Sequence, residues 1–81
     1  MEAKEKSMSH DYRTTEDLVR IAARGGGFTI NGGTRNVEDL IKIAAAGSST
    51  RARITFTNMS AMTAEELIRI GGAGNGSVEF A

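Results

Sequence analysis

The chain has 81 residues, with ten basic and ten acidic side chains and no cysteine. This length makes one small domain, and a net charge near zero removes the general electrostatic argument for nucleic acid or an anionic membrane as a partner. Without cysteine there are no disulfides and no thiolate chemistry, and one histidine with scattered carboxylates is a poor ligand set for zinc. We therefore expect no metal and no cofactor.

Residues 1–13, MEAKEKSMSHDYR, form a charged stretch without the apolar region of a signal peptide. No apolar run in the chain approaches the ~20 residues of a membrane span. We therefore expect a soluble, cytoplasmic protein whose residues 1–13 are a largely disordered leader. Met8, His10 and Tyr12 alternate along the chain, so a strand over residues 7–12 stays open as an alternative.

Three later segments share one pattern of residue types. TTEDLVRIAARGGGFTI starts at Thr14, NVEDLIKIAAAGSSTRARITF at Asn36 and TAEELIRIGGAGNGSVEF at Thr63, so the starting points are 22 and then 27 residues apart. The match extends over twelve positions, which is too long to be expected by chance. It predicts a single domain over residues 14–81, built from three tandem helix–strand units at 14–30, 36–56 and 63–80.

Each unit opens with a helix signal. Thr14, Asn36 and Thr63 are N-cap residue types, and each is followed by an acidic residue three positions later. Apolar residues then recur at the i, i+3 and i+4 spacing of one helix face, as in the first unit at Leu18, Ile21 and Ala22.

Glycine marks the expected end of each helix. The triplet Gly25–Gly27 looks like a phosphate loop, but it follows a helix, where carbonyl groups and the negative end of the dipole lie. Phosphate groups bind at the opposite end, before a helix. We therefore interpret the triplet as a helix end and a turn, and expect Gly25, Gly47 and Gly74 to occupy the C′ position of their helices.

Each unit closes with a short strand, predicted at Phe28–Ile30, Ile54–Phe56 and Val78–Phe80. Alternation gives these strands one apolar face toward the helices and one polar face. We call the second the polar sheet face, and it comprises Thr29, Asn31, Arg53, Thr55, Thr57, Ser77 and Glu79. Short connections imply right-handed crossovers and parallel strands. The predicted fold class is α/β, with a two-layer βα-repeat, a mostly parallel three- to four-stranded sheet and helices on one face.

The stretch ITFTNMSAMTAEELIRI (Ile54–Ile70) resembles one unit of a leucine-rich repeat, with alternating apolar residues, an asparagine and then an apolar-Thr helix entry. FTINGGTRNVEDLIKI (Phe28–Ile43) is a shorter match, and the resemblance covers about residues 14–81. Leucines are few, and the asparagine falls one position differently at Asn31 and Asn58, which argues against a regular asparagine ladder. The resemblance implies a curved parallel sheet and a binding role, commonly for proteins.

Candidate catalytic groups are few. His10 has no partner carboxylate or nucleophile placed by a motif. The acidic pair at the start of each unit recurs at the same position, which indicates a helix start and not a catalytic pair. The loop Asn31–Arg35 leads from a strand into a helix, where Gly32, Gly33, Thr34 and Arg35 would hold an anion. It lacks a G-x-G-x-x-G or Walker pattern, so a plain turn is favoured.

The sequence thus predicts a small module that acts by binding, with another protein or a second copy as partner. Leu, Ile, Val and Phe total 16 residues, about a fifth of the chain, so self-association would add burial to a small core. The polar sheet face and the C-terminal edge strand are the expected surfaces. One alternative is an anion- or nucleotide-binding protein or cryptic enzyme using Asn31–Arg35. Another is a nucleic-acid-binding regulator with a patch of Arg24, Arg35, Arg51 and Arg53, although aromatic residues for base stacking are scarce.

Overall fold

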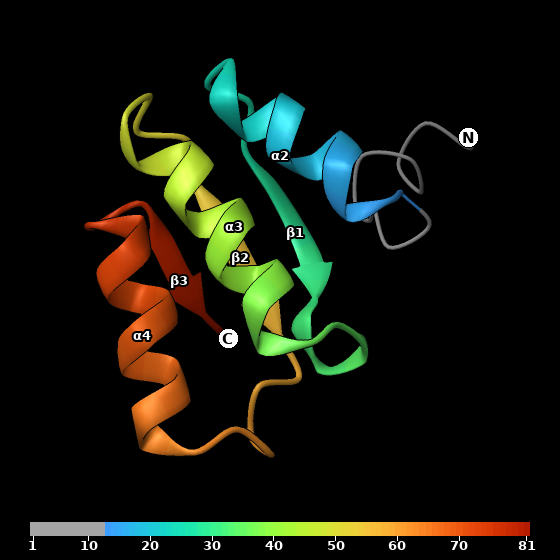
Figure 1. The fold of residues 1–81 in the computed structure, drawn as a ribbon, viewed down its shortest axis with the longest axis vertical. Coiled ribbons are helices and arrows are strands. Elements are labelled where there is room, and N and C mark those ends of the chain that lie inside the picture. The colour runs from blue at the N-terminus through green and yellow to red at the C-terminus, as the bar shows by residue number, and fades with distance from the viewer. Residues whose placement is uncertain (1–12) are drawn as a thin grey trace.

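The computed structural model describes residues 13–81 (Figure 1). Apart from Arg13, the predicted leader lies outside the described residues, as do the possible strand over residues 7–12 and His10. Helices and strands alternate along the described chain, with one short 3₁₀ turn after the first strand. The elements are α2 (Thr15–Ala23), β1 (Phe28–Asn31), η1 (Gly32–Thr34), α3 (Val37–Ser48), β2 (Ile54–Thr57), α4 (Ala64–Gly74) and β3 (Val78–Phe80).

The three helices begin where their N-cap residues predicted. The side chains of Thr14, Asn36 and Thr63 each accept a hydrogen bond from the backbone N–H three residues later, at 3.1, 2.9 and 3.2 Å. At α4 the Glu66 carboxylate also accepts from the Thr63 backbone N–H at 2.9 Å, which completes a capping box.

The predicted C′ position is confirmed for Gly25 and wrong for Gly47 and Gly74. Gly25 follows the C-cap of α2 with a φ of 88°, as expected of a C′ glycine. Gly47 lies inside α3, which continues to Ser48, and Gly74 is the last residue of α4. The left-handed residue after α4 is Asn75, with a φ of 50°.

Close packing explains why Gly47 and Gly74 are glycines. A Cβ atom on Gly47 would lie 2.7 Å from Ile54 Cδ1, and one on Gly74 would collide with Val78 Cγ2. Each glycine therefore lets its helix approach the strand that follows it. The contact that requires each glycine comes from a residue of the following strand. The rule that glycine ends a helix uses only neighbouring residues and therefore does not predict it.

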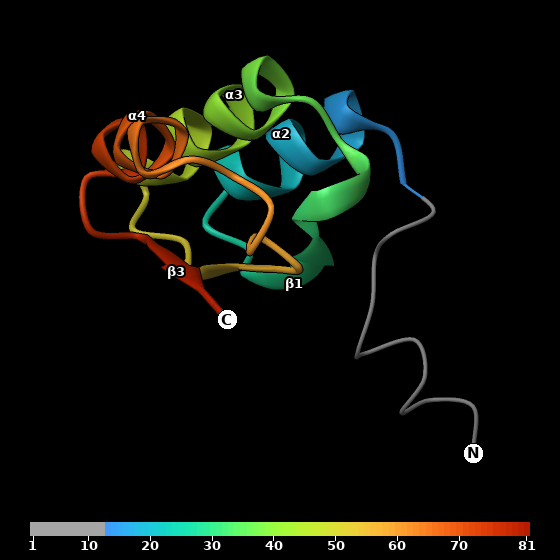
Figure 2. The ribbon, with the colours of Figure 1, turned by 90° about the horizontal axis from the view of Figure 1, so that it is seen from below.

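The strands form one parallel sheet in the order β1-β2-β3. Ile30 lies opposite Phe56, and Phe56 lies opposite Phe80. β1 and β2 each extend one residue beyond the predicted strand, to Asn31 and Thr57. The helices α2, α3 and α4 of the described residues pack against the same face of the sheet (Figure 2). The predicted fold class, an α/β fold with a parallel sheet and helices on one face, is confirmed.

The core lies between the helix layer and the apolar sheet face. Phe56 on the central strand is fully buried, and its ring stacks with that of Phe80 at a centroid distance of 6.4 Å. The buried apolar residues are Leu18, Ala22, Phe28, Ile30, Leu40, Ile43, Ala44, Ala52, Ile54, Phe56, Met59 and Ile70. No helix among residues 13–81 has the length and apolar character to cross a membrane.

The asparagines of the leucine-rich-repeat resemblance have different roles. Asn31 lies opposite Thr57 in the sheet, and Thr57 is the residue before Asn58. The Asn31 side chain caps η1, whereas Asn58 takes a left-handed backbone with a φ of 58°. The two residues are therefore out of register, in agreement with the prediction that they form no regular ladder.

Candidate functional site

The polar sheet face is the face that the helix layer leaves uncovered (Figure 2). Register places Thr29, Thr55 and Glu79 in one row across the three strands. Asn31 and Thr57 form a neighbouring row on β1 and β2. Adjacent strands lie about 4.8 Å apart, so each row is a continuous polar ridge. The structure therefore brings residues from all three units onto one surface.

Some side chains of the polar sheet face also hold the local backbone. Asn31 Oδ1 accepts from the Gly33 backbone N–H at 2.8 Å, and Thr57 Oγ1 donates to the Ile30 carbonyl at 3.3 Å. Ser77 Oγ donates to the Gly74 carbonyl at 2.7 Å, which ties the start of β3 to the end of α4. Among the predicted residues, Thr29, Arg53 and Glu79 are exposed.

The outer edge of β3 is the second predicted surface. The Ser77 carbonyl accepts from the Ile54 backbone N–H, and the Ala81 backbone N–H donates to the Phe56 carbonyl, both at 2.9 Å. These groups point toward β2. Successive residues of a parallel strand turn their backbone groups to opposite edges, so the N–H and C=O groups of Val78 and Phe80 point outward.

The loop Gly32–Thr34 has the position expected of an anion site, but two of its donors already have partners at Asn31. The Gly33 backbone N–H donates to Asn31 Oδ1, and Thr34 Oγ1 donates to the Asn31 carbonyl at 3.2 Å. A Cβ on Gly33 would lie 2.8 Å from the Asn58 carbonyl oxygen, and one on Gly32 would collide with Met59 Sδ. The glycines therefore allow close contact between two neighbouring loops.

Arg35 connects this loop to the start of α2. Its guanidinium donates to Thr15 Oγ1 at 3.1 Å and to the Arg13 carbonyl at 2.7 Å. The side chain is half-buried. This geometry gives Arg35 a structural role that its position in the sequence did not indicate, because its partners precede it by about twenty residues in the chain.

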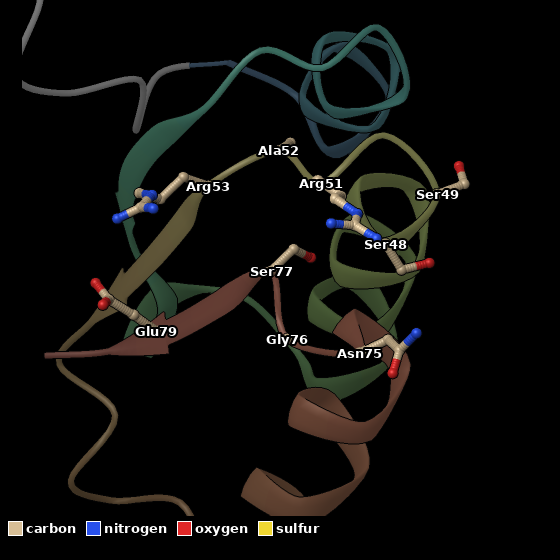
Figure 3. A pocket seen from close by; sticks show the side chains of 9 residues that line it. All are labelled: Ser48, Ser49, Arg51, Ala52, Arg53, Asn75, Gly76, Ser77 and Glu79. Carbon is tan, nitrogen blue, oxygen red and sulfur yellow. The ribbon is translucent and has the colours of Figure 1, made fainter.

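A hollow of about 550 Å³ lies at the amino ends of β2 and β3, beside the carboxyl ends of α3 and α4 (Figure 3). Arg51 lies on the Ser48 side of the hollow, and Arg53 lies on the Glu79 side. The hollow is lined by Ser48, Ser49, Arg51, Ala52, Arg53, Asn75, Gly76, Ser77 and Glu79. This hollow was not predicted from the sequence. The order of helices and strands does indicate it, because loops that precede adjacent parallel strands meet at one end of a sheet.

The four arginines of the predicted basic patch do not meet. Arg24, Arg51 and Arg53 lie in segments that connect a helix to the strand after it, whereas Arg35 follows a strand. In a parallel α/β layer these two kinds of connection lie at opposite ends. A basic surface would therefore consist of the first three residues at most.

The acidic pairs occupy the first turns of α2, α3 and α4, as predicted from their positions. Within residues 13–81 there is no cluster of three or more His, Cys, Asp or Glu side chains placed to hold a metal ion. No protein-family model matches the chain, and neither a curated protein nor a solved structure gives a significant match to it. The geometry of the described residues is therefore the basis for a functional proposal.

Proposed function

We propose that the chain is a non-catalytic protein-binding module that uses its polar sheet face, with the β3 edge as a second contact. The observation that supports this most is the uncovered parallel sheet. Parallel sheets ordinarily have helices on both faces, and here the helices cover one face (Figure 2). A partner protein on the polar sheet face would give the sheet its missing layer.

The chemistry of the polar sheet face suits a protein partner. Thr29 and Thr55 stand side by side on strands and have short side chains, which lose little conformational entropy on binding. Arg53 and Glu79 add charges of opposite sign at its rim, where they would set orientation. We further propose that the three units act as a short α/β solenoid, whose extended sheet surface is the usual binding surface of such proteins, and that the protein acts in the cytoplasm.

Site-specific photo-cross-linking tests this proposal. A benzophenone amino acid is placed at Thr29 or Thr55 on the polar sheet face, or at Ala45, which is exposed on α3. After irradiation in a lysate of the source cells, we expect discrete protein adducts from the two sheet positions and not from Ala45. The adducts should disappear when Thr55→Arg is combined with the Thr29 probe.

Equal adducts from the sheet positions and from Ala45, or adducts that survive Thr55→Arg, would contradict the proposal. The unfolding midpoint of each labelled chain in urea serves as the control. It shows that lost adducts reflect a changed surface and not a changed fold.

The anion-binding alternative rests on the position of η1, which follows β1 and precedes α3. That is the end of a parallel sheet where ligands bind. Inorganic phosphate and ADP, titrated while the backbone amide signals of residues 32–36 are followed by NMR, separate the two proposals. Saturable shifts that Gly33→Ala abolishes without unfolding would favour the anion site, and their absence would remove it.

A nucleic-acid role rests on Arg24, Arg51 and Arg53 at one end of the molecule. Binding through such a surface weakens steeply as salt rises, because each neutralised phosphate releases counterions. Salt-dependent retention of a DNA or RNA oligonucleotide, lost in Arg51→Ala, would support this third possibility.

A further inference from the structure

The outer face of α4 and the adjoining edge of β3 form an apolar surface, which we call the α4 end face (Ile68, Gly71, Gly72 and Phe80). Ile68 is 70% exposed and Phe80 is 39% exposed, and they are the exposed large hydrophobic residues of the described chain. A Cβ on Gly71 would lie 3.8 Å from the Phe80 ring, so the helix face and the ring adjoin. Ile68 precedes Gly71 by three residues and therefore lies on the same side of α4.

The same helix position is covered in the two earlier units. Ala22 in α2 and Ala44 in α3 correspond to Gly71, and both are fully buried. The Cβ of Ala22 lies 3.7 Å from the Cβ position of Gly47, and that of Ala44 lies 3.5 Å from the Cβ position of Gly74. Each helix thus packs on this position of the helix before it, whereas no further helix among residues 13–81 does so for Gly71, which adjoins only the Phe80 ring.

The residues that correspond to Ile68 support this comparison. Val19 and Ile41 occupy its position in α2 and α3, and both are partly buried against the core. The α4 end face therefore repeats a surface that the molecule already uses for packing between its units. Beside it lie the outward N–H and C=O groups of Val78 and Phe80, so a helix surface and a strand edge are available together.

We propose that a second copy of the chain covers the α4 end face, with the two end faces meeting around a two-fold axis. This inference rests on the proposed function, since it identifies the partner at one of the proposed surfaces. None of the four residues of the α4 end face is charged. The nearest charge on that side of α4 is Glu65, three residues before Ile68, which lies at its rim. Gly71 and Gly72 would let two α4 helices approach closely, and the β3 edges would pair as antiparallel strands.

Charge and packing at the other end of the helix layer argue against head-to-tail contact. The outer side of α2 carries Arg20 and Arg24, and Arg24 stands where α3 and α4 have alanine. Gly26 folds against Ile21 there, because its backbone N–H donates to the Ile21 carbonyl at 3.0 Å. Asp17 lies in the same region, but Ile68 offers no polar group, so head-to-tail contact would desolvate these charges without compensation from the second copy. A symmetric pairing avoids this and is the commonest arrangement of homodimers.

Sedimentation equilibrium of the full chain over a wide concentration range tests the proposal. We expect a dimer that dissociates on dilution, and an increase of at least about tenfold in its dissociation constant with Ile68→Glu. Ala45→Glu is the matched control, because it adds the same charge at an exposed position on α3. It should leave the dissociation constant unchanged.

Gly72→Gln provides a second variant that separates folding from assembly. Nothing lies within 4 Å of a Cβ at Gly72, so the new side chain fits the monomer and favours the helix. We expect a higher urea midpoint for the dilute monomer together with a weaker dimer. A substitution that acted only on the fold of the monomer would not raise monomer stability and weaken the dimer at the same time.

A wild-type chain that stays monomeric at high concentration would overturn the inference, as would a dimer unaffected by Ile68→Glu. A filament or ring would indicate head-to-tail contact and would also overturn it. The proposed function is tested separately, because adducts from Thr29 report on the polar sheet face. Ile68→Glu should leave those adducts in place, and a failed dimer would not remove them.

Discussion

Glycines of this chain serve different physical purposes, and the individual residue is the scale at which they differ. Gly25 supplies a left-handed backbone with a φ of 88°. Gly74 lies on the inner side of α4 and allows contact with Val78. Gly72, two residues earlier, meets nothing within 4 Å of its Cβ position. Within a single copy of the chain, the same residue type in one helix is thus required at one position and carries only an entropic disadvantage at another.

Replacing these two glycines by alanine should change stability in opposite directions. Gly74→Ala forces a methyl group into Val78, so we expect a loss of about 1–3 kcal/mol in the free energy of unfolding. Gly72→Ala should gain about 0.5–1 kcal/mol, because alanine restricts the unfolded chain and favours a helix. Urea denaturation at low protein concentration measures both. A stabilising Gly74→Ala would contradict the close packing of α4 on β3.

At the scale of the element, the helices share one direction, because each precedes a strand of the same parallel sheet. Their positive ends therefore lie together at one end of the molecule. Each first turn holds two acidic residues, which is favourable beside that end of the dipole. The N-cap residues add hydrogen bonds to backbone N–H groups that the helix itself cannot satisfy.

The capping box of α4 offers a direct test of these contributions. Thr63→Ala removes the acceptor for the Glu66 backbone N–H, which lies at 3.2 Å, so we expect a loss of about 1 kcal/mol in the free energy of unfolding. Thr63→Ser keeps the hydroxyl group and should stay within a few tenths of a kcal/mol of the wild type. Equal losses in the two variants would show that the methyl group, and not the cap, stabilises the helix.

At the scale of the whole molecule, β3 stabilises the central strand although it has only three residues. Its segment accepts from Ile54 and donates to Phe56 through backbone hydrogen bonds, and Phe80 stacks on Phe56. The central strand β2 therefore depends on the last residues of the chain for half of its pairing. Its apolar residues Ile54 and Phe56 are both fully buried.

A chain that ends at Asn75 should consequently lose its cooperative unfolding transition. Phe80→Ala in the full chain removes only the ring and should retain a cooperative transition, weakened by about 1–3 kcal/mol because the ring is partly exposed. Thermal unfolding followed by circular dichroism distinguishes the two variants. If the shortened chain unfolds as sharply as the full chain, β3 does not belong to the cooperative core.

The sequence by itself determined the helices, their N-caps, the strands and the sorting of strand residues into an apolar and a polar face. These features follow from residues within about four positions of one another, where side-chain type and backbone geometry act together. The seven residues of the polar sheet face could be named for this reason. Parallel order then followed from the short connections between helix and strand.

Only the tertiary structure decided the features that depend on distant partners. Ile54 and Val78 leave no room for a Cβ atom at Gly47 and Gly74. Thr50 Oγ1 donates to the Ala22 carbonyl at 2.7 Å across 28 positions. The contacts of Arg35 and the hollow beside Arg51 arise in the same way. Such contacts depend on which elements become neighbours in the fold. A local sequence pattern does not specify the distance between segments that come together only through packing.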